Sequence, residues 1–376
     1  MCLMRGGTSR GPFFLASDLP ANIETRNQVL LAAMGSPHPL QVDGLGGGHP
    51  LTSKVGIVSP SPLDEVDVDF EFAQLQPNET SVQTTANCGN MLSAVVPFAV
   101  ESGLIIPDSD STEVTVRTTN TGLIATITIQ TPRVPGRNDR AVRYEGATAI
   151  DGVAGTSSPV SIMFVNTAGS IAPSLLPTGN RLDSLPLPDG SQIEATMIDN
   201  GQPLVLLRAE DLRLSGSEET TDLASDSTLV NTLEHLRLVA GHRMGMGDVT
   251  DKSYPKMTII APPTDGGAIK TRSFIPHTVH PSIGVLAALT VATAASTDGT
   301  IAFPLSDSGE GELRTLDIEH PSGAFPVDLQ VRDNEVIRSG LTRTARLLMA
   351  GQVFVPRSIW NSPPTKNPTH SEGTQR

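Results

Sequence analysis

Two stretches of this chain repeat the same order of elements, and this repeat limits the folds that the chain can adopt. In the first, the segment 53–58 (Ser-Lys-Val-Gly-Ile-Val) has the pattern of a strand entered through Lys54, and an apolar helix starting near Cys88 follows it. In the second, a strand entered through Lys256 precedes an apolar helix starting near Ser282. Both helices are apolar nearly all round, as expected for helices wrapped by sheet. The repeat therefore predicts two similar lobes.

The length of 376 residues also favours two lobes, because it exceeds what one hydrophobic core usually accommodates. Pro and Gly concentrate near 173–188, so we assign 1–183 to the first lobe and 184–342 to the second. The final strand is expected to return to the first lobe, which therefore also takes 343–376. The Pro-, Thr- and Ser-rich end, 361–376, is expected to be a disordered tail.

Sequence periodicity predicts more sheet than helix. Apolar and polar residues alternate with period two in the segments 66–72, 114–116 and 124–129, which is typical of antiparallel strands. Helical patterns cover 22–34, 88–102, 227–240 and 282–295, and the first three are expected to end at Gly35, Gly103 and Gly241.

The charge balance restricts the possible partners. Lys and Arg total 26 against 40 Asp and Glu, which gives a net charge of −14. The field of such a chain repels polyanions, so we expect neither nucleic-acid nor membrane binding. A small anion can still bind, because backbone amides and local cations act at short range. No segment reads as a signal peptide or reaches the roughly 18 apolar residues of a membrane span, so a cytoplasmic location is expected.

Cys88 stands in a polar, glycine-flanked setting, Thr-Ala-Asn-Cys-Gly-Asn, at the predicted start of a helix. Unpaired N–H groups and the positive end of the helix dipole favour a thiolate there and favour an anion beside it. The only other cysteine in the sequence is Cys2, so a disulfide framework or a cysteine metal cluster does not explain it. The alternative for a lone cysteine is a small buried hydrophobe.

Lys54 follows a glycine-rich segment, 44–53, and enters an apolar strand. A lysine in that place is usually a solvated strand end, but burial would lower the pKa of its amine toward the range that a lysine base needs. Lys256 and Ser282 are the counterparts of Lys54 and Cys88 in the second half. Ser282 is expected to cap its helix, and its hydroxyl can also reach a substrate in the cleft.

Several common chemistries have little support in the sequence. The glycine-rich runs 5–11 and 44–48 match no nucleotide-binding signature, and Ser157 does not form a serine-hydrolase elbow. Four histidines lack the spacing of metal ligands, and we expect them to be structural or surface residues: His49, His277, His280 and His320. We therefore expect neither a metal nor another cofactor.

Five blocks of the chain together resemble the PrpF-like isomerase family. They are RGGTSRG at 5–11, DGLGGGHPLTSK at 43–54, NCGNM at 87–91, GMGDV at 245–249 and EHPSG at 319–323. The resemblance extends from Leu3 to about Pro356. The family includes methylaconitate isomerases, methylitaconate isomerases and 4-oxalomesaconate tautomerases. Membership implies an α+β, diaminopimelate-epimerase-like fold with two pseudo-symmetric lobes, each a curved, mainly antiparallel sheet around a central helix, and a site between them.

The resemblance also implies which residues form the site. Lys54 and Cys88 would be the catalytic pair. Arg10 stands where the family commonly has lysine, which keeps the charge and changes the detail of the contact. The expected substrate-binding residues are Thr8, Ser9, Ser53, Asn87, Gly89, Asn90, Met91, Lys256, Ser282, Ile283 and Gly284.

A lysine and a cysteine from one lobe suit proton transfer within one substrate. Racemases of this fold use two thiols, one from each lobe, and the segment 280–284 contains no cysteine. We therefore expect keto–enol or allylic isomerisation of a small unsaturated tricarboxylate, with 4-oxalomesaconate favoured over methylaconitate or methylitaconate. An alternative of another class is a non-catalytic accessory protein for an aconitase-like dehydratase. A homodimer is one expected assembly.

Overall fold

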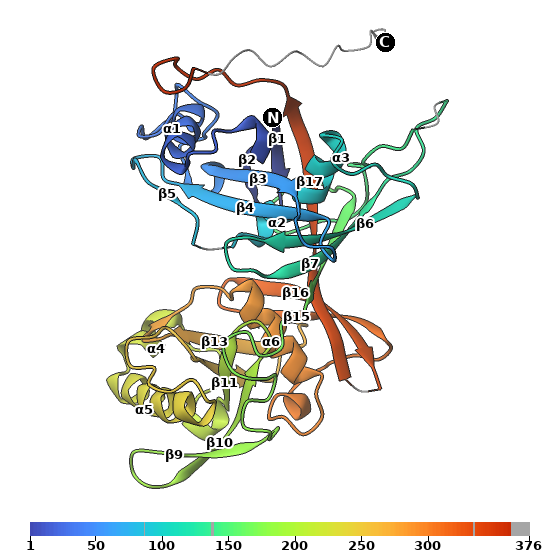
Figure 1. Cartoon of the computed structure of the whole chain (residues 1–376). Helices are drawn as coiled ribbons and strands as arrows, with labels where there is room; N and C mark the ends of the chain where they lie inside the picture. Colours follow the sequence, from blue (N-terminus) through green and yellow to red (C-terminus); the bar gives the residue numbers. More distant parts are fainter. Residues whose placement is uncertain (86, 137–138, 334, 362–376) are drawn as a thin grey trace.

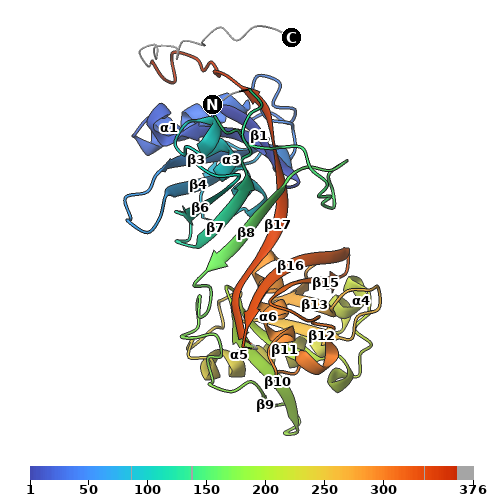
Figure 2. The same ribbon diagram turned by 90° about the vertical axis from the view of Figure 1, so that its right-hand side faces the viewer.

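The chain forms two lobes joined by a pair of strands. The computed structural model describes residues 1–85, 87–136, 139–333 and 335–361, so the predicted tail lies outside the described residues from 362 onward. The joining strands are β8 (Pro159–Val165) and β17 (Glu335–Ala350), which pair antiparallel where they pass between the lobes (Figures 1 and 2). The side chains of β8 alternate between buried and more exposed, as in a strand with one covered face, whereas β17 is buried in two runs at 339–341 and 344–345 and more exposed toward its ends.

In the first lobe the strands form a ring. The order around it is β1, β2, β3, β4, β6, β7, β8 and β17, which pairs with β1 again, and β5 extends the sheet beside β4. The pairs β2–β3 and β4–β6 are parallel and the others are antiparallel. The remaining bounds are β1 Cys2–Gly6, β2 Ser9–Leu15, β3 Lys54–Pro60, β4 Val68–Leu75, β5 Val82–Gln83, β6 Ser111–Thr118 and β7 Ile124–Gln130.

The second lobe repeats this pairing scheme. Its order is β10, β11, β12, β13, β15, β16 and β17, with β11–β12 and β13–β15 parallel, β14 beside β13, and β9 added outside β10. The bounds are β9 Asp183–Pro186, β10 Gln192–Asp199, β11 Pro203–Arg208, β12 Lys256–Ala261, β13 Ile269–Ile275, β14 Thr278–Val279, β15 Leu313–His320 and β16 Gly323–Arg332. The two lobes are therefore topological copies, in which β3 and β12 correspond.

Each sheet encloses a helix and carries others outside. In the first lobe α2 (Gly89–Leu92) and α3 (Val95–Glu101) pack against the inner face, and in the second α6 (Val285–Ala295) does so. Helix α1 (Ile23–Met34) covers the outer face of β2 and β3, while α4 and α5 lie outside the second sheet (Figure 1). The bounds of these last two are α4 Thr220–Ser225 and α5 Ser227–Arg243. The inner residues of both lobes form one continuous apolar cluster.

Two helix predictions need correction. The segment predicted as one helix over 88–102 consists of α2 and α3, separated at Ser93 and Ala94. Pro97 explains the break. Proline has no N–H to donate to the carbonyl four residues earlier, but it is tolerated in the first turn of a new helix. Helix α5 continues past the predicted stop at Gly241, where a methyl group would lie 2.4 Å from Val249 Cγ2, so this glycine permits close packing instead.

The start of α6 also differs from the prediction. The helix begins at Val285 with Gly284 as its N-cap, so Ser282 does not cap it. By contrast, α1 has its expected boundaries: the Asn22 side chain accepts a hydrogen bond from Thr25 N, and Gly35 closes the helix in the left-handed region at φ 77°.

The architecture confirms the α+β class, with mainly antiparallel sheet around inner helices. The ranges 1–183 with 343–376, and 184–342, stay a prediction for the two lobes. Among the described residues, no helix combines the length and apolar character needed to cross a membrane.

Candidate active site

The structure places Lys54 at the inner rim of the first lobe. It is the first residue of β3, its side chain is 9% exposed, and its neighbours on the same face, Gly56 and Val58, point toward the inner cluster. The ammonium nitrogen lies 5.0 Å from the centre of the Phe72 ring, within the range of a cation–π contact. The residue is thus buried, rather than a solvated strand end.

Gln74 holds the Lys54 side chain. The two residues are directly opposite in the β3–β4 register, and Lys54 Nζ donates to Gln74 Oε1 over 2.7 Å. The amide nitrogen of Gln74 donates in turn to the carbonyls of Pro50, Ser53 and Leu75. These bonds fix which side of the amide faces the lysine, so Gln74 presents an acceptor to it.

Cys88 meets Lys54 from the inner helix. It is the N-cap residue of α2, half-buried, with its backbone extended at φ −134°. Its Sγ lies 3.6 Å from Lys54 Nζ, a hydrogen-bond distance for sulfur. The strand and the helix thus bring the two predicted catalytic residues into contact.

The hairpin between β1 and β2 lies against the same end of α2. Asn90 Nδ2 donates to Thr8 Oγ1 over 2.9 Å, and methyl groups on Gly6 or Gly7 would lie 2.3 and 2.2 Å from Asn90 oxygens. Only glycine therefore permits this approach. Ser9 is buried, and its Oγ has no hydrogen-bond partner among the described residues, so a ligand could satisfy this hydroxyl.

The other predicted residues of the first lobe have different surroundings. Ser53 is fully buried, and its hydroxyl is used by Gln41 Oε1 and the His49 carbonyl, so its side chain supports the loop before Lys54. Asn87 donates to Thr121 Oγ1, while its buried Oδ1 has no partner within the described part of the chain. Met91 lies within α2 and is fully buried, so its side chain belongs to the inner core cluster.

The second lobe presents its own helix start to the first. A methyl group on Gly89 would lie 3.6 Å from Val285 Cγ2, so the beginnings of α2 and α6 face each other. Gly284 caps α6, and Ile283 beside it is 5% exposed. Lys256 stands at the start of β12, and burial lowers the pKa of its amine.

Two histidines that the sequence analysis read as structural or surface residues lie beside these groups. Burial, and then the nearby Lys256, lower the pKa of His280. Burial, and then His280 and Arg272, lower the pKa of His320, whose Nε2 lies 3.4 Å from Ser282 Oγ. The two imidazoles thus lie beside Lys256 and Ser282, the second-lobe residues that the sequence predicts for the site. Within the described residues, no three His, Cys, Asp or Glu side chains are placed to hold a metal.

A short sequence signal could have identified these histidines. Both stand in the tripeptide His-Pro-Ser, and in both the Nδ1 accepts from the serine backbone N–H, at 2.9 Å for His280 and 3.3 Å for His320. Proline has no N–H, so the next residue supplies the donor to the ring. In the neutral form each ring then carries its proton on Nε2.

Comparison with known proteins agrees with this architecture. Residues 1–356 match the model of the PrpF protein family. A (4E)-oxalomesaconate Delta-isomerase from Novosphingobium sp. is 46% identical over 94% of this chain and 96% of that protein, and a 4-oxalomesaconate tautomerase from Pseudomonas putida is 45% identical over 96% and 97%. The crystal structure of a methylitaconate-delta-isomerase superposes with a TM-score of 0.83, at 30% identity and 98% coverage of both chains. The predicted resemblance is confirmed, and the chain belongs to the PrpF family.

Proposed function

We propose that this isomerase moves a proton within 4-oxalomesaconate, with Lys54 and Cys88 as the proton-transfer pair. The observation that carries the proposal is the 3.6 Å contact between Lys54 Nζ and Cys88 Sγ in a mostly buried setting. Relatives at 45 and 46% identity, named for oxalomesaconate, support the choice of substrate.

The reaction needs one group that takes a proton from carbon and one that returns it elsewhere. In the proposed sequence, the neutral amine of Lys54 removes a proton from a carbon next to the conjugated system, and the electron pair moves into the ketone and carboxylates as a dienolate. Cys88 delivers a proton to another atom of that system. The substrate thus loses one proton and gains one, and transfer of a proton from the Lys54 ammonium to the Cys88 thiolate across their 3.6 Å contact returns both groups to their starting forms.

The second lobe supplies recognition in this proposal. The start of α6 faces the end of the first lobe that carries Cys88. Lys256, His280 and His320 lie close to one another in the second lobe. Partial positive charges and N–H donors there suit carboxylates, which gain charge-assisted hydrogen bonds in a water-poor site. The unpaired Ser9 Oγ adds a donor from the first lobe.

An allylic shift in methylitaconate or methylaconitate is the second candidate. The structural match to a methylitaconate-delta-isomerase over 98% of both chains favours it, because the same pair could serve either proton path. We rank it second because that identity is 30%, against 45 and 46% for the oxalomesaconate relatives.

Ultraviolet absorbance of the purified full chain with 4-oxalomesaconate and, separately, 2-methylaconitate separates the candidates. We expect kcat/KM at least about tenfold higher with 4-oxalomesaconate, equivalent to about 1.4 kcal/mol. A preference for 2-methylaconitate would replace the favoured substrate by the second. If the chain turned over neither substrate, and if Lys54→Ala fully restored the activity of a dehydratase partner, the result would favour an accessory protein instead. The reaction is assigned to the cytoplasm in this proposal.

A further inference from the structure

Arginines from three neighbouring strands form a row on the first lobe. Arg5 on β1 lies directly opposite Arg10 on β2 and directly opposite Arg346 on β17. Residues directly opposite in an antiparallel pair share one face of the sheet, and like charges so placed destabilise it. The net charge of −14 shows that acidic residues outnumber basic ones in this chain, so a shortage of acidic residues does not explain this row of arginines.

This row lies on the opposite side of the sheet from Lys54 and Cys88. Met4 and Gly6 point inward, since Met4 is fully buried in the inner cluster and Gly6 abuts Asn90. Side chains alternate along a strand, so Arg5 between them points outward. The row is therefore separated from the catalytic pair by the β1–β2 sheet itself.

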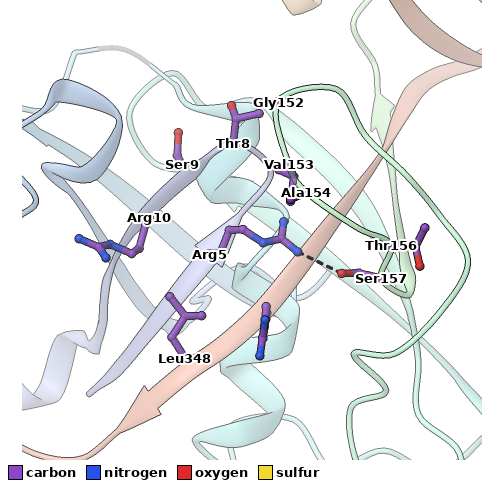
Figure 3. Close-up of a pocket in the computed structure, with 11 residues that line it drawn as sticks. Arg5, Thr8, Ser9, Arg10, Gly152, Val153, Ala154, Thr156, Ser157 and Leu348 are labelled. Carbon is purple, nitrogen blue, oxygen red and sulfur yellow. Dashed lines mark hydrogen bonds between the residues drawn. The ribbon is translucent and has the colours of Figure 1, made fainter.

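A cavity of about 370 Å³ opens above this face, beneath the loop 152–157. Arg5, Arg10 and Arg346 line it with loop residues such as Thr156 and Ser157, and Thr8 and Ser9 of the β1–β2 hairpin border it as well. Figure 3 shows Arg5 reaching toward Ser157, to which it donates over 3.3 Å, while Arg10 extends away from them. Carbonyls of Gly7 and Thr344 and the Thr344 hydroxyl hold the other end of the Arg5 guanidinium.

The charge in this cavity is uncompensated. Across the part of the chain that the structure describes, none of the three arginines forms an ion pair, and no acidic residue lines the cavity. The acidic residue of the covering loop, Asp151, interacts with Arg343 instead. Burial lowers the pKa of Arg5, and the nearby positive charge of Arg346 lowers it further. Arg10 Nε is buried, with no hydrogen-bond partner in the residues that the structure describes.

We propose that this cavity is a second anion site, which binds a small multivalent anion between Arg5, Arg346 and the loop 152–157. Guanidinium groups bind planar carboxylate and tetrahedral phosphate in a bidentate manner, so a polycarboxylate or a phosphate has the required chemistry. The volume admits such a molecule, and its charge would relieve the repulsion within the row. This proposal does not rest on the function proposed above.

The test is calorimetric titration of the full chain with citrate and, separately, inorganic phosphate at low salt. Arg346→Gln removes one charge from an exposed side chain, and Arg332→Gln makes the same change at an exposed arginine of β16. We expect Arg346→Gln to weaken binding about tenfold or more and Arg332→Gln to leave it unchanged. Lys54→Met should retain the site, because the catalytic pair lies across the sheet.

A second variant keeps the test decisive. Leu348→Glu places a carboxylate at the cavity, where it should abolish anion binding and raise the thermal midpoint by compensating the arginines. For the binding that Arg346→Gln weakens, a higher affinity for citrate than for phosphate identifies the ligand class as a polycarboxylate, and the reverse identifies phosphate. Absence of binding to the unmodified chain, equal binding by Arg346→Gln and Arg332→Gln, or loss of binding in Lys54→Met would overturn the proposal.

Discussion

Lys54 Nζ and Cys88 Sγ lie 3.6 Å apart although their residues are separated by 34 positions in the chain. The contact depends on two independent elements, because the lysine begins β3 and the cysteine caps α2. The glycine contacts of the β1–β2 hairpin with Asn90 fix α2 against the sheet, and Gln74 fixes the direction of the lysine.

Gln74 is predicted to be a positioning residue. Gln74→Met removes the acceptor for Lys54 Nζ, and an ordinary hydrogen bond contributes about 0.5–1.5 kcal/mol, so kcat should fall about twofold to tenfold with little change in KM. Gln74→Glu keeps an acceptor there but makes it a carboxylate, which disfavours the neutral amine that the proposed base needs, so kcat should fall as well. Steady-state kinetics of the two variants measures both effects.

Gln83 provides the matched control, since it lies opposite Gln74 on β5 and is exposed. Gln83→Met should leave the kinetics unchanged. Equal losses in Gln74→Met and Gln83→Met would mean that the sheet edge, and not the bond to Lys54, determines the rate.

Stability should decrease as pH falls through the titration of His280 and His320. Their pKa values are lower in the folded chain than the ordinary 6.5, so the unfolded chain binds more protons in that range. The stabilisation is present above the pKa that the histidines have in the unfolded chain. It is lost as pH falls toward their lower pKa values in the folded chain. Urea unfolding at about pH 7.5 and about pH 5.5 measures the difference.

Replacing both rings tests the assignment. In the double variant His280→Gln, His320→Gln, the free energy of unfolding should decrease less between about pH 7.5 and about pH 5.5. His38→Gln changes an exposed histidine and should leave that decrease as it is in the unmodified chain. An unchanged pH dependence in the double variant would assign the effect to other groups.

Arg237 is predicted to be essential for the stability of the second lobe. It is fully buried, pairs with Glu234, and donates to the carbonyls of Val249, Thr250, Lys252 and Tyr254. Arg237→Met leaves these groups without their partner and should cost about 3–5 kcal/mol of unfolding free energy. Chemical unfolding gives the value, with Arg332→Met as the exposed control. A cost equal to that of the control would show that the network adds no stability.

Gly11 should be irreplaceable in β2. A methyl group there would lie 1.8 Å from the Lys54 carbonyl oxygen, so Gly11→Ala must separate β2 from β3 and shift the catalytic lysine. We expect a lower thermal midpoint and a lower kcat. Gly351→Ala has open space around it and should change neither. A Gly11→Ala protein with unaltered stability would contradict the close approach described for these strands.

Much of this architecture was predictable from local sequence patterns. Asn22 and Gly35 mark the start and end of α1, and the two strands that begin with a lysine indicate the duplicated topology. These features were predictable because each signal lies within a short segment of the sequence. Pro97 also carried a signal, since proline inside one continuous helix would have clashed with the preceding turn. The His-Pro-Ser tripeptides carried another.

Other features depend on contacts between distant segments. Gln74 gains its role only from the β3–β4 register, which the composition of neither strand specifies. Gly241 is an interior helix residue because Val249 packs against it, which outweighs the usual role of glycine as a helix stop. The pairing of Arg5 with Arg346 likewise requires β17 to return from the second lobe to the first.

The most direct test of the central claim is exchange of substrate protons in deuterated buffer, followed by NMR for the full chain, Lys54→Met and Cys88→Ser. The account predicts that the unmodified chain incorporates deuterium into 4-oxalomesaconate and that either substitution slows incorporation by at least about a hundredfold, because each removes one member of the proton-transfer pair. Exchange at the unmodified rate in both variants would contradict it.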